Sequence, residues 1–403
     1  MAGGIIMATG CMEKFEEGTF GADVAFLKKH VDVVLLTRGD SAVALVPQYQ
    51  GRVMTSTVGG ANGPSFGWLN YEVIKKGLLQ PEKRKGSLED HIHVFGGEER
   101  FWLGPEGGQF AIFFAPGSEF VFDNWHTPAA IDTDAYELVS QNEDSAKFTH
   151  KCELLNWSGA KFDVLVERTI RLLDSAAIEK VLKQPIAEGV KTVAYESENR
   201  ITNNGNAAWT EKSGMLSIWL LGMYKPSSGT TVVIPFKEGA KWRLGMKVND
   251  TYFGKLPPEY LKVEDNVAFL KGDGTRRGKI GVSPKRSLGV AGSYDANGKM
   301  LTIVVYNQPY KYSGYVNSMW ELQRHPFVGD AVNAYNDGSP EPGKPPLGPF
   351  YELETSSPAA DLDPGESMTH IQKTIHVTGP EHLLDPIARK TLGVGIEEIK
   401  KAL

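Results

Sequence analysis

The chain of 403 residues carries 43 basic and 49 acidic side chains, so its formal net charge is −6. This charge disfavours a nucleic-acid partner, because binding to phosphate requires a basic surface. Hydrophobic residues make up 41% of the chain, which excludes disorder as its main state, and 44 glycines and 23 prolines indicate many turns and favour β architecture.

In chain order, the first feature is a short apolar segment that ends in small residues before Cys11. It is similar to the second half of a bacterial lipoprotein signal, in which the cysteine becomes the lipidated N-terminus, although a basic region before it is missing. A frayed terminus with an incidental cysteine is the alternative. We expect an exported periplasmic or outer-membrane lipoprotein, with residues 1–22 as signal remnant and tether, residues 23–403 as one domain, and a lipid at Cys11 as the only membrane contact.

Residues 23–30 predict a short helix, after which the hydrophobic pattern changes to the alternation of strands. Paired strands joined by tight turns are predicted at 31–37 with 41–47, 147–157 with 162–173, and 290–294 with 300–306. Further strands are predicted at 51–58, 192–203, 215–224, 230–236, 351–355 and 367–377. Residues 381–403 predict two short helices divided at 393–395. The pattern therefore predicts an all-β sandwich with short helices at the termini.

The stretch 91–109 is the richest in chemical groups, and it also holds five glycines, which let a backbone approach a ligand closely. Trp102 offers a flat apolar face, and Arg100, Glu98 and Glu106 offer charged hydrogen bonds. An aromatic platform ringed by such groups suits a sugar. The alternative is a rigid loop with a structural Arg–Glu pair. His91 and His93 share one face of a strand, but two ligands do not make a metal site, so we expect neither a metal nor a cofactor.

A second candidate is the strand 350–358, in which Glu352 and Glu354 lie on one face. Two like charges so close raise the pKa of one carboxyl if the face is buried, which suits a general acid or base. A solvated outer face is the alternative. His126 and His325 are included as substrate-binding candidates, although isolated histidines more often have a surface or core role. Trp320 precedes His325 by five residues and is expected to line the same cleft.

Five short motifs, in this order, resemble the galactose-mutarotase-like superfamily, to which aldose 1-epimerases belong. They are Gln50-Gly51-Arg52-Val53, His93-Val94-Phe95-Gly96-Gly97, residues 162–174, Leu353-Glu354-Thr355, and residues 362–367. The run from Gly96 to Gly108 is also similar to an uncharacterised group of exported Bacteroides-type proteins in that superfamily. The resemblance implies a β-supersandwich fold and a small-molecule carbohydrate ligand, and it adds Arg52 to the substrate-binding candidates.

The resemblance also implies a mechanism of proton transfer alone. In mutarotases a glutamate takes the proton of the anomeric hydroxyl and a histidine returns one to the ring oxygen. Here Glu354 or Glu352 matches the base, and His93 is the candidate acid. The mid-chain turn at 201–206 lacks the histidine that mutarotases carry there, which puts mutarotation in doubt and leaves sugar binding intact.

Three functions therefore stay open: an aldose 1-epimerase-like isomerase, a non-catalytic glycan-binding lipoprotein, and a glycoside-processing enzyme that uses paired carboxylates such as Glu106 and Glu354. For each, we predict that the glycine-rich segment and the Glu352/Glu354 strand meet in one cleft. Arg100 should then lie close to a carboxylate of that strand, and Trp102 should line the cleft with its face open. Replacing either residue with alanine is expected to lose sugar binding without unfolding the protein.

Overall fold

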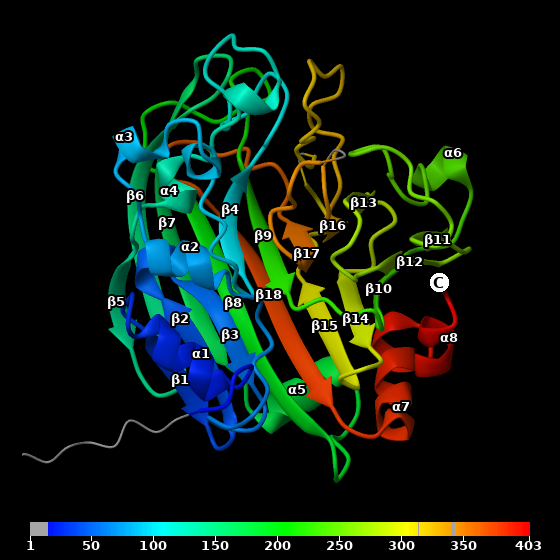
Figure 1. The fold of residues 1–403 in the computed structure, drawn as a ribbon. Coiled ribbons are helices and arrows are strands. Elements are labelled where there is room, and N and C mark those ends of the chain that lie inside the picture. Colours follow the sequence, from blue (N-terminus) through cyan, green and yellow to red (C-terminus); the bar gives the residue numbers. More distant parts are fainter. Residues whose placement is uncertain (1–14, 313, 341–342) are drawn as a thin grey trace, which may run out of the picture.

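The computed structural model describes residues 15–312, 314–340 and 343–403, and three antiparallel sheets dominate this part of the chain. The predicted lipoprotein signal and Cys11 lie outside the described residues. The mostly β architecture confirms the predicted fold class. Figure 1 shows the long strands of the largest sheet running side by side, with the C-terminal helices packed at one end of it.

The largest sheet has ten strands, in the spatial order β11 (Leu261–Val263), β12 (Val267–Lys271), β10 (Thr230–Pro235), β14 (Val290–Asp295), β15 (Met300–Tyr306), β18 (Ser367–Thr378), β8 (Lys191–Asn203), β7 (Lys161–Leu172), β6 (Ser145–Leu155) and β5 (Glu137–Gln141). The second sheet has five strands, in the order β13 (Gly278–Val282), β16 (Val332–Asn336), β17 (Tyr351–Ser356), β9 (Ser217–Tyr224) and β4 (Arg100–Gly104). The third consists of β1 (Val34–Arg38), β2 (Ser41–Val46) and β3 (Arg52–Thr57).

The predicted hairpins are confirmed where local turn chemistry specifies them. Strands β1 and β2, β6 and β7, and β14 and β15 pair as antiparallel neighbours. In β7 the burial pattern alternates almost without a break, with apolar side chains on the buried face. This alternation places one face of the strand in the core and fixes its register.

The helices differ from the prediction in position. Helix α1 (Phe20–Leu27) begins three residues earlier than expected, because the Thr19 side chain caps it by accepting from the backbone N–H of Ala22. Helices α7 (Glu381–Leu392) and α8 (Ile396–Lys400) are confirmed, and Gly393 ends α7 in the left-handed conformation.

Helix is not confined to the chain ends, contrary to the prediction. Helix α5 (Ser175–Leu182) lies between β7 and β8, is capped by Asp174 and buries Ile178 and Leu182, one turn apart. Four shorter helices are α2 (Tyr71–Lys76), α3 (Pro81–Arg84), α4 (Ala129–Asp132) and α6 (Lys241–Leu244).

The two larger sheets face each other across a partly polar interior. Thr355 of β17 bonds to His370 and Gln372 of β18, so this face of the five-stranded sheet points toward the ten-stranded sheet. Neighbouring side chains on a strand point to opposite faces. Glu352 and Glu354 therefore point away from the ten-stranded sheet, which fixes the side on which the candidate site lies.

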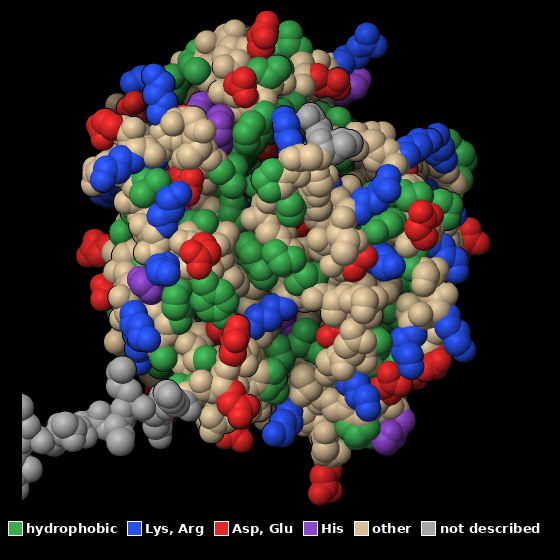
Figure 2. Space-filling view, viewed as in Figure 1, with side chains coloured by type: hydrophobic (Ala, Val, Ile, Leu, Met, Phe, Trp, Pro, Cys, Tyr) green, Lys and Arg blue, Asp and Glu red, His purple; other side chains and the backbone are tan. Residues whose placement is uncertain are grey.

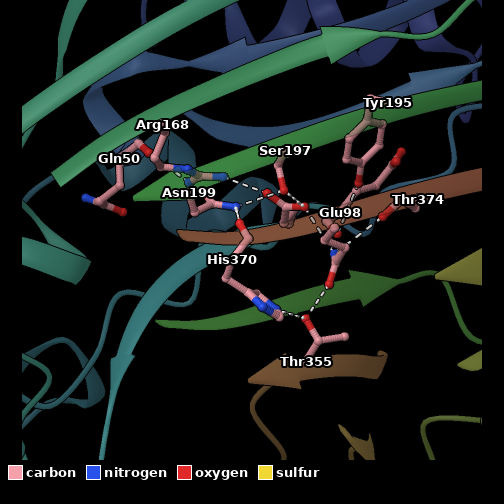
Figure 3. A network of polar contacts seen from close by, with 11 residues as sticks. Gln50, Glu98, Arg168, Tyr195, Ser197, Asn199, Thr355, His370 and Thr374 are labelled. Carbon is pink, nitrogen blue, oxygen red and sulfur yellow. Dashed lines mark hydrogen bonds and ion pairs between the residues drawn. The ribbon is translucent and has the colours of Figure 1, made fainter. Parts of the chain in front are cut away.

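Figure 3 shows the buried polar network between the sheets. Arg168, which interrupts the apolar face of β7, donates to Glu99 at 2.7 Å, and both side chains are fully buried. Ser197 and Gln372 donate to the other oxygen of Glu99. A buried charge is tolerated when it is paired and hydrogen-bonded, as both oxygens of Glu99 are here, although Arg168 Nε has no partner among the described residues. On the outside, Figure 2 shows acidic and basic side chains interspersed over the visible face.

Candidate functional site

The register of the five-stranded sheet builds the site. Trp102 of β4 pairs with Trp219 of β9, and Trp219 pairs in turn with Ser356 of β17. Directly paired residues point to the same face of a sheet. The side chains of Glu354 and Arg100, which both pair with Leu221, therefore point to the same face of the five-stranded sheet. This face is turned away from the ten-stranded sheet.

Arg100 and Glu352 form a buried ion pair in this cluster. The Arg100 Nη2 donates to Glu352 Oε1 at 2.6 Å, and the two side chains are 5% and 7% exposed. The guanidinium also lies over the Trp102 ring, 4.5 Å from its centroid. The predicted meeting of Arg100 with a carboxylate of this strand is confirmed, although 252 residues separate the partners.

Glu354 is fully buried, and its two carboxylate oxygens differ in their hydrogen bonding. Its Oε2 accepts from Lys279 Nζ at 2.8 Å and from Trp219 Nε1 at 2.9 Å. Its Oε1 has no hydrogen-bond partner among the described residues. A buried carboxylate oxygen without a partner is costly in a folded protein, so this atom is a position where a ligand hydroxyl or a water is favoured.

Burial shifts the pKa of two other carboxyls in the same cluster. Desolvation raises the pKa of Glu352, with Arg100 opposing the shift and the charge of Glu354 adding to it. Desolvation also raises the pKa of Glu106, which Lys279 partly offsets and Glu354 reinforces. The site therefore combines Glu354, which is bonded to a lysine ammonium, with two carboxyls, Glu352 and Glu106, whose pKa is raised.

A small cavity lies at one end of the cluster, and all five strands line it. It measures about 20 Å³, which leaves room for roughly one water molecule. The strands contribute Gly104, Ser217, Trp219, Ser356, Asn333 and Lys279, and the covering loops contribute Tyr252, Val316, Ser318 and Asp330. Tyr252 and Asn249 donate to Asp330 at 2.6 and 3.1 Å, which ties two of these loops together.

The prediction that Trp102 has an open face is wrong. Its side chain is buried, with 4% exposed, because Phe113, Trp125 and Trp219 surround the ring at centroid distances of 5.3 to 6.5 Å. Trp125 also stacks on Trp320, 6.1 Å away, and Trp320 lies beside Glu106. The aromatic groups expected at the site are present, but loop residues cover them.

Several predicted site residues lie elsewhere. His93 is buried and its Nδ1 bonds to Asp132 at 2.8 Å. Glu98 is buried between the sheets, where it accepts from Ser56 and contacts His376. Glu98 therefore faces the interior, opposite to Arg100, and the structure does not bring it or His93 to the cluster.

Arg52, His126 and His325 are also not brought to the cluster. Arg52 is buried, and its guanidinium donates to the carbonyl of Gly96 and to Gln50. His126 is exposed, with its Nδ1 bonded to the carbonyl of Asp90, and His325 is exposed as well. Each of these residues has a local structural role or faces solvent.

Sequence analysis missed Lys279, Trp219, Tyr252, Asn333 and Asp330. Lys279 lies on a strand of only five residues, and Tyr252 and Asp330 lie on loops, so no local pattern marks them as functional. Trp219 is the one of these residues that the sequence could have indicated, because it lies on a strand that is buried along its whole length. Among the described residues, no group of three or more His, Cys, Asp or Glu is placed to hold a metal ion.

Comparison with known proteins assigns the family. Residues 18–403 match the family of unknown function DUF6786. The chain belongs to DUF6786. A search of curated proteins finds no sequence similar to this DUF6786 chain.

Solved structures of other proteins match this DUF6786 chain at low sequence identity. The Slr1438 protein from Synechocystis sp. PCC 6803 is 12% identical, with a TM-score of 0.50, and the match covers 92% of this chain and 100% of that one. A putative aldose 1-epimerase from Klebsiella pneumoniae is 11% identical, with a TM-score of 0.47 and coverage of 90% and 87%. One from Escherichia coli K12 is 14% identical, with a TM-score of 0.45 and coverage of 87% and 100%. The Slr1438 match shows similarity of fold alone.

Proposed function

We propose that the cluster around Glu354 binds a carbohydrate and transfers protons at its anomeric centre, as an aldose 1-epimerase-like isomerase does. The observation that carries the proposal is Glu354 itself. One of its oxygens is held by Lys279 and Trp219, and the other is buried without a partner among the described residues. A sugar hydroxyl that donates to this second oxygen satisfies it and is placed for deprotonation.

The acid in this proposal is Glu106 and no longer His93, because His93 is bonded to Asp132. Desolvation raises the pKa of Glu106, so its protonated form persists closer to neutral pH. Glu354 takes the proton of the anomeric hydroxyl while Glu106 gives one to the ring oxygen, and the bond between the anomeric carbon and the ring oxygen breaks. Ring closure on the other face of the carbonyl, with both protons returned, gives the other anomer.

The covering loops are part of the proposal. A cavity of about 20 Å³ holds one water, which is much less than a monosaccharide. Binding therefore requires that the segment with Val316 and Ser318, or the loop with Tyr252, moves away. Opening these loops uncovers Trp219, whose indole N–H already holds Glu354 and whose ring can pack on a sugar face.

Glycoside hydrolysis is the second candidate. The charges of Glu106 and Glu354 influence each other, and the nearby cavity has room for one water. An inverting hydrolase needs an acid, a base and such a water between them. A protein that binds glycans without catalysis is the third candidate, with the same contacts and no turnover.

The test is exchange NMR on D-glucose, D-galactose, D-mannose and D-xylose with catalytic amounts of protein. The proposal expects faster α/β interconversion of at least one of these sugars, and loss of that acceleration in Glu354→Gln. Release of a reducing sugar from an aryl glycoside, without interconversion, would favour hydrolysis. Sugar-dependent line broadening without either reaction would favour the binding protein.

A further inference from the structure

Two serine hydroxyls line the small cavity at the end of the cluster, whereas its other polar groups, Lys279, Asn333 and Asp330, already have hydrogen-bond partners in the protein. Ser217 is 1% exposed, yet neither its hydroxyl nor that of Ser356 makes a side-chain hydrogen bond to any described residue. Both side chains line the cavity together with Lys279, Asn333 and Asp330. Hydroxyls in folded proteins are almost always hydrogen-bonded to protein or to water, so these two serines favour a guest that both donates and accepts.

The space for that guest is kept open by glycine. A Cβ added at Gly104 would lie 2.9 Å from the Ser217 Oγ and 3.2 Å from the Val316 Cγ2. A Cβ added at Gly281, on the neighbouring part of the sheet, would lie 2.1 Å from Asp330 Oδ2. Side chains at these two positions would intrude on Ser217 and Asp330, which line the cavity, so the cavity depends on their absence.

The charges around the cavity select against ionic guests. Lys279 and Asp330 lie on the same wall, and the Lys279 ammonium is already bonded to Glu354. A carboxylate guest would meet Asp330, and an ammonium guest would meet Lys279.

We propose that this cavity is a subsite for one uncharged hydroxyl of the ligand, which displaces an ordered water and bonds to Ser217 and its neighbours. The proposal rests on the proposed carbohydrate function and adds to it a rule of specificity. The site should prefer neutral sugars over uronic acids and amino sugars. It should also depend on one particular hydroxyl of the bound sugar, because loss of that hydroxyl leaves buried polar groups unpaired.

The test measures the affinity of D-glucose, D-galactose and their monodeoxy analogues for the full chain by titration calorimetry. For the sugar that binds, one deoxy analogue should bind roughly 10-fold to 100-fold more weakly, as expected when a buried polar group loses its partner. Ser217→Ala should weaken the parent sugar and leave that analogue unchanged. Gly104→Ala should weaken the parent sugar more strongly. Ser367→Ala, on the distant strand β18, is the control and should leave affinities unchanged.

The outcomes separate the two proposals. If neither sugar binds wild type, the carbohydrate function fails and the subsite fails with it. If a sugar binds but every deoxy analogue responds to Ser217→Ala as the parent does, only the subsite proposal is overturned. A crystal structure of the unliganded protein gives a second readout, in which an ordered water bonded to Ser217 is expected. A dry cavity would overturn the subsite proposal directly.

Discussion

Glu354 is held by contacts that fit a glutamine almost as well. In Glu354→Gln the amide oxygen can replace Oε2 as the acceptor for Lys279 and Trp219, while the amide nitrogen occupies the unpartnered position. The variant keeps the shape of the site but cannot take a proton. We expect sugar binding to persist and anomer interconversion to fall by about 100-fold or more, measured by exchange NMR.

The matched control for this variant is Glu153→Gln. Glu153 pairs with Lys161 on β6 and β7, and its side chain is 56% exposed. Its replacement should leave interconversion at the wild-type rate. Equal rates in Glu354→Gln and wild type would contradict the assignment of Glu354 as the base.

The buried pair of Arg100 and Glu352 leads to a prediction about stability. Arg100→Met leaves a buried carboxylate without its cation, so the free energy of unfolding should fall by about 3–5 kcal/mol in urea titrations. Adding Glu352→Gln should restore part of this loss. Arg100 and Trp102 are each 4% exposed, so Arg100→Ala and Trp102→Ala should also lower the free energy of unfolding, and whether these variants stay folded remains a prediction.

Arg38→Met provides the comparison. Arg38 pairs with Asp144 on the surface, with both side chains more than two-fifths exposed, and such pairs contribute about 1 kcal/mol or less. If Arg100→Met costs no more than Arg38→Met, the pair at the site is not effectively buried.

At the scale of elements, strand β17 is supported from behind by strand β18. Thr355 donates to Gln372 Oε1 at 2.6 Å, so its hydroxyl accepts from His370 Nε2 at 2.9 Å. His370 is then neutral, with its proton on Nε2, and its Nδ1 has no partner among the described residues. Figure 3 shows Thr355 and His370 pointing toward each other between the two sheets.

This support predicts a pH dependence of stability. Burial lowers the pKa of His370 to about 3, from its usual 6.5. Above pH 6.5 the ring is neutral in both folded and unfolded chains. As the pH falls from 6.5 toward 3, His370 becomes protonated in the unfolded chain but stays neutral in the folded chain. The free energy of unfolding should therefore decrease by about 1.4 kcal/mol per pH unit for this residue.

His370→Gln should remove this component, and His126→Gln, which changes an exposed histidine, should keep it. The raised pKa of Glu352 acts in the opposite direction, since it favours the folded chain at low pH, but it contributes equally to both variants. Parallel stability curves for wild type and His370→Gln between pH 6 and pH 4 would contradict the lowered pKa.

The elements that sequence analysis predicted correctly are those with local signals. The hairpin at Asn297-Gly298 and the alternation in β7 follow from residues that are neighbours in the chain. Lys279 reaches Glu354, which lies 75 positions away in the chain, only because β13, β16 and β17 pair in one register. Trp102, which the sequence predicted to be open, is buried because the rings of Phe113, Trp125 and Trp219 surround it.

At the scale of the whole molecule, the predicted export of the chain stays a prediction. Among the described residues, no helix is long and apolar enough to span a membrane. Labelling of cells with a radioactive fatty acid should mark the wild-type protein and not Cys11→Ser. Equal labelling of both proteins, or of neither, would rule out a lipid at this cysteine.

A crystal structure of the protein soaked in a monosaccharide would show directly whether the buried cluster around Glu354 is a carbohydrate site. We expect a sugar whose anomeric hydroxyl donates to Glu354 Oε1, with the segment at Val316 and Ser318 or the loop at Tyr252 displaced. A sugar bound only on the outer surface, with Glu354 still enclosed and the cavity unchanged, would contradict it.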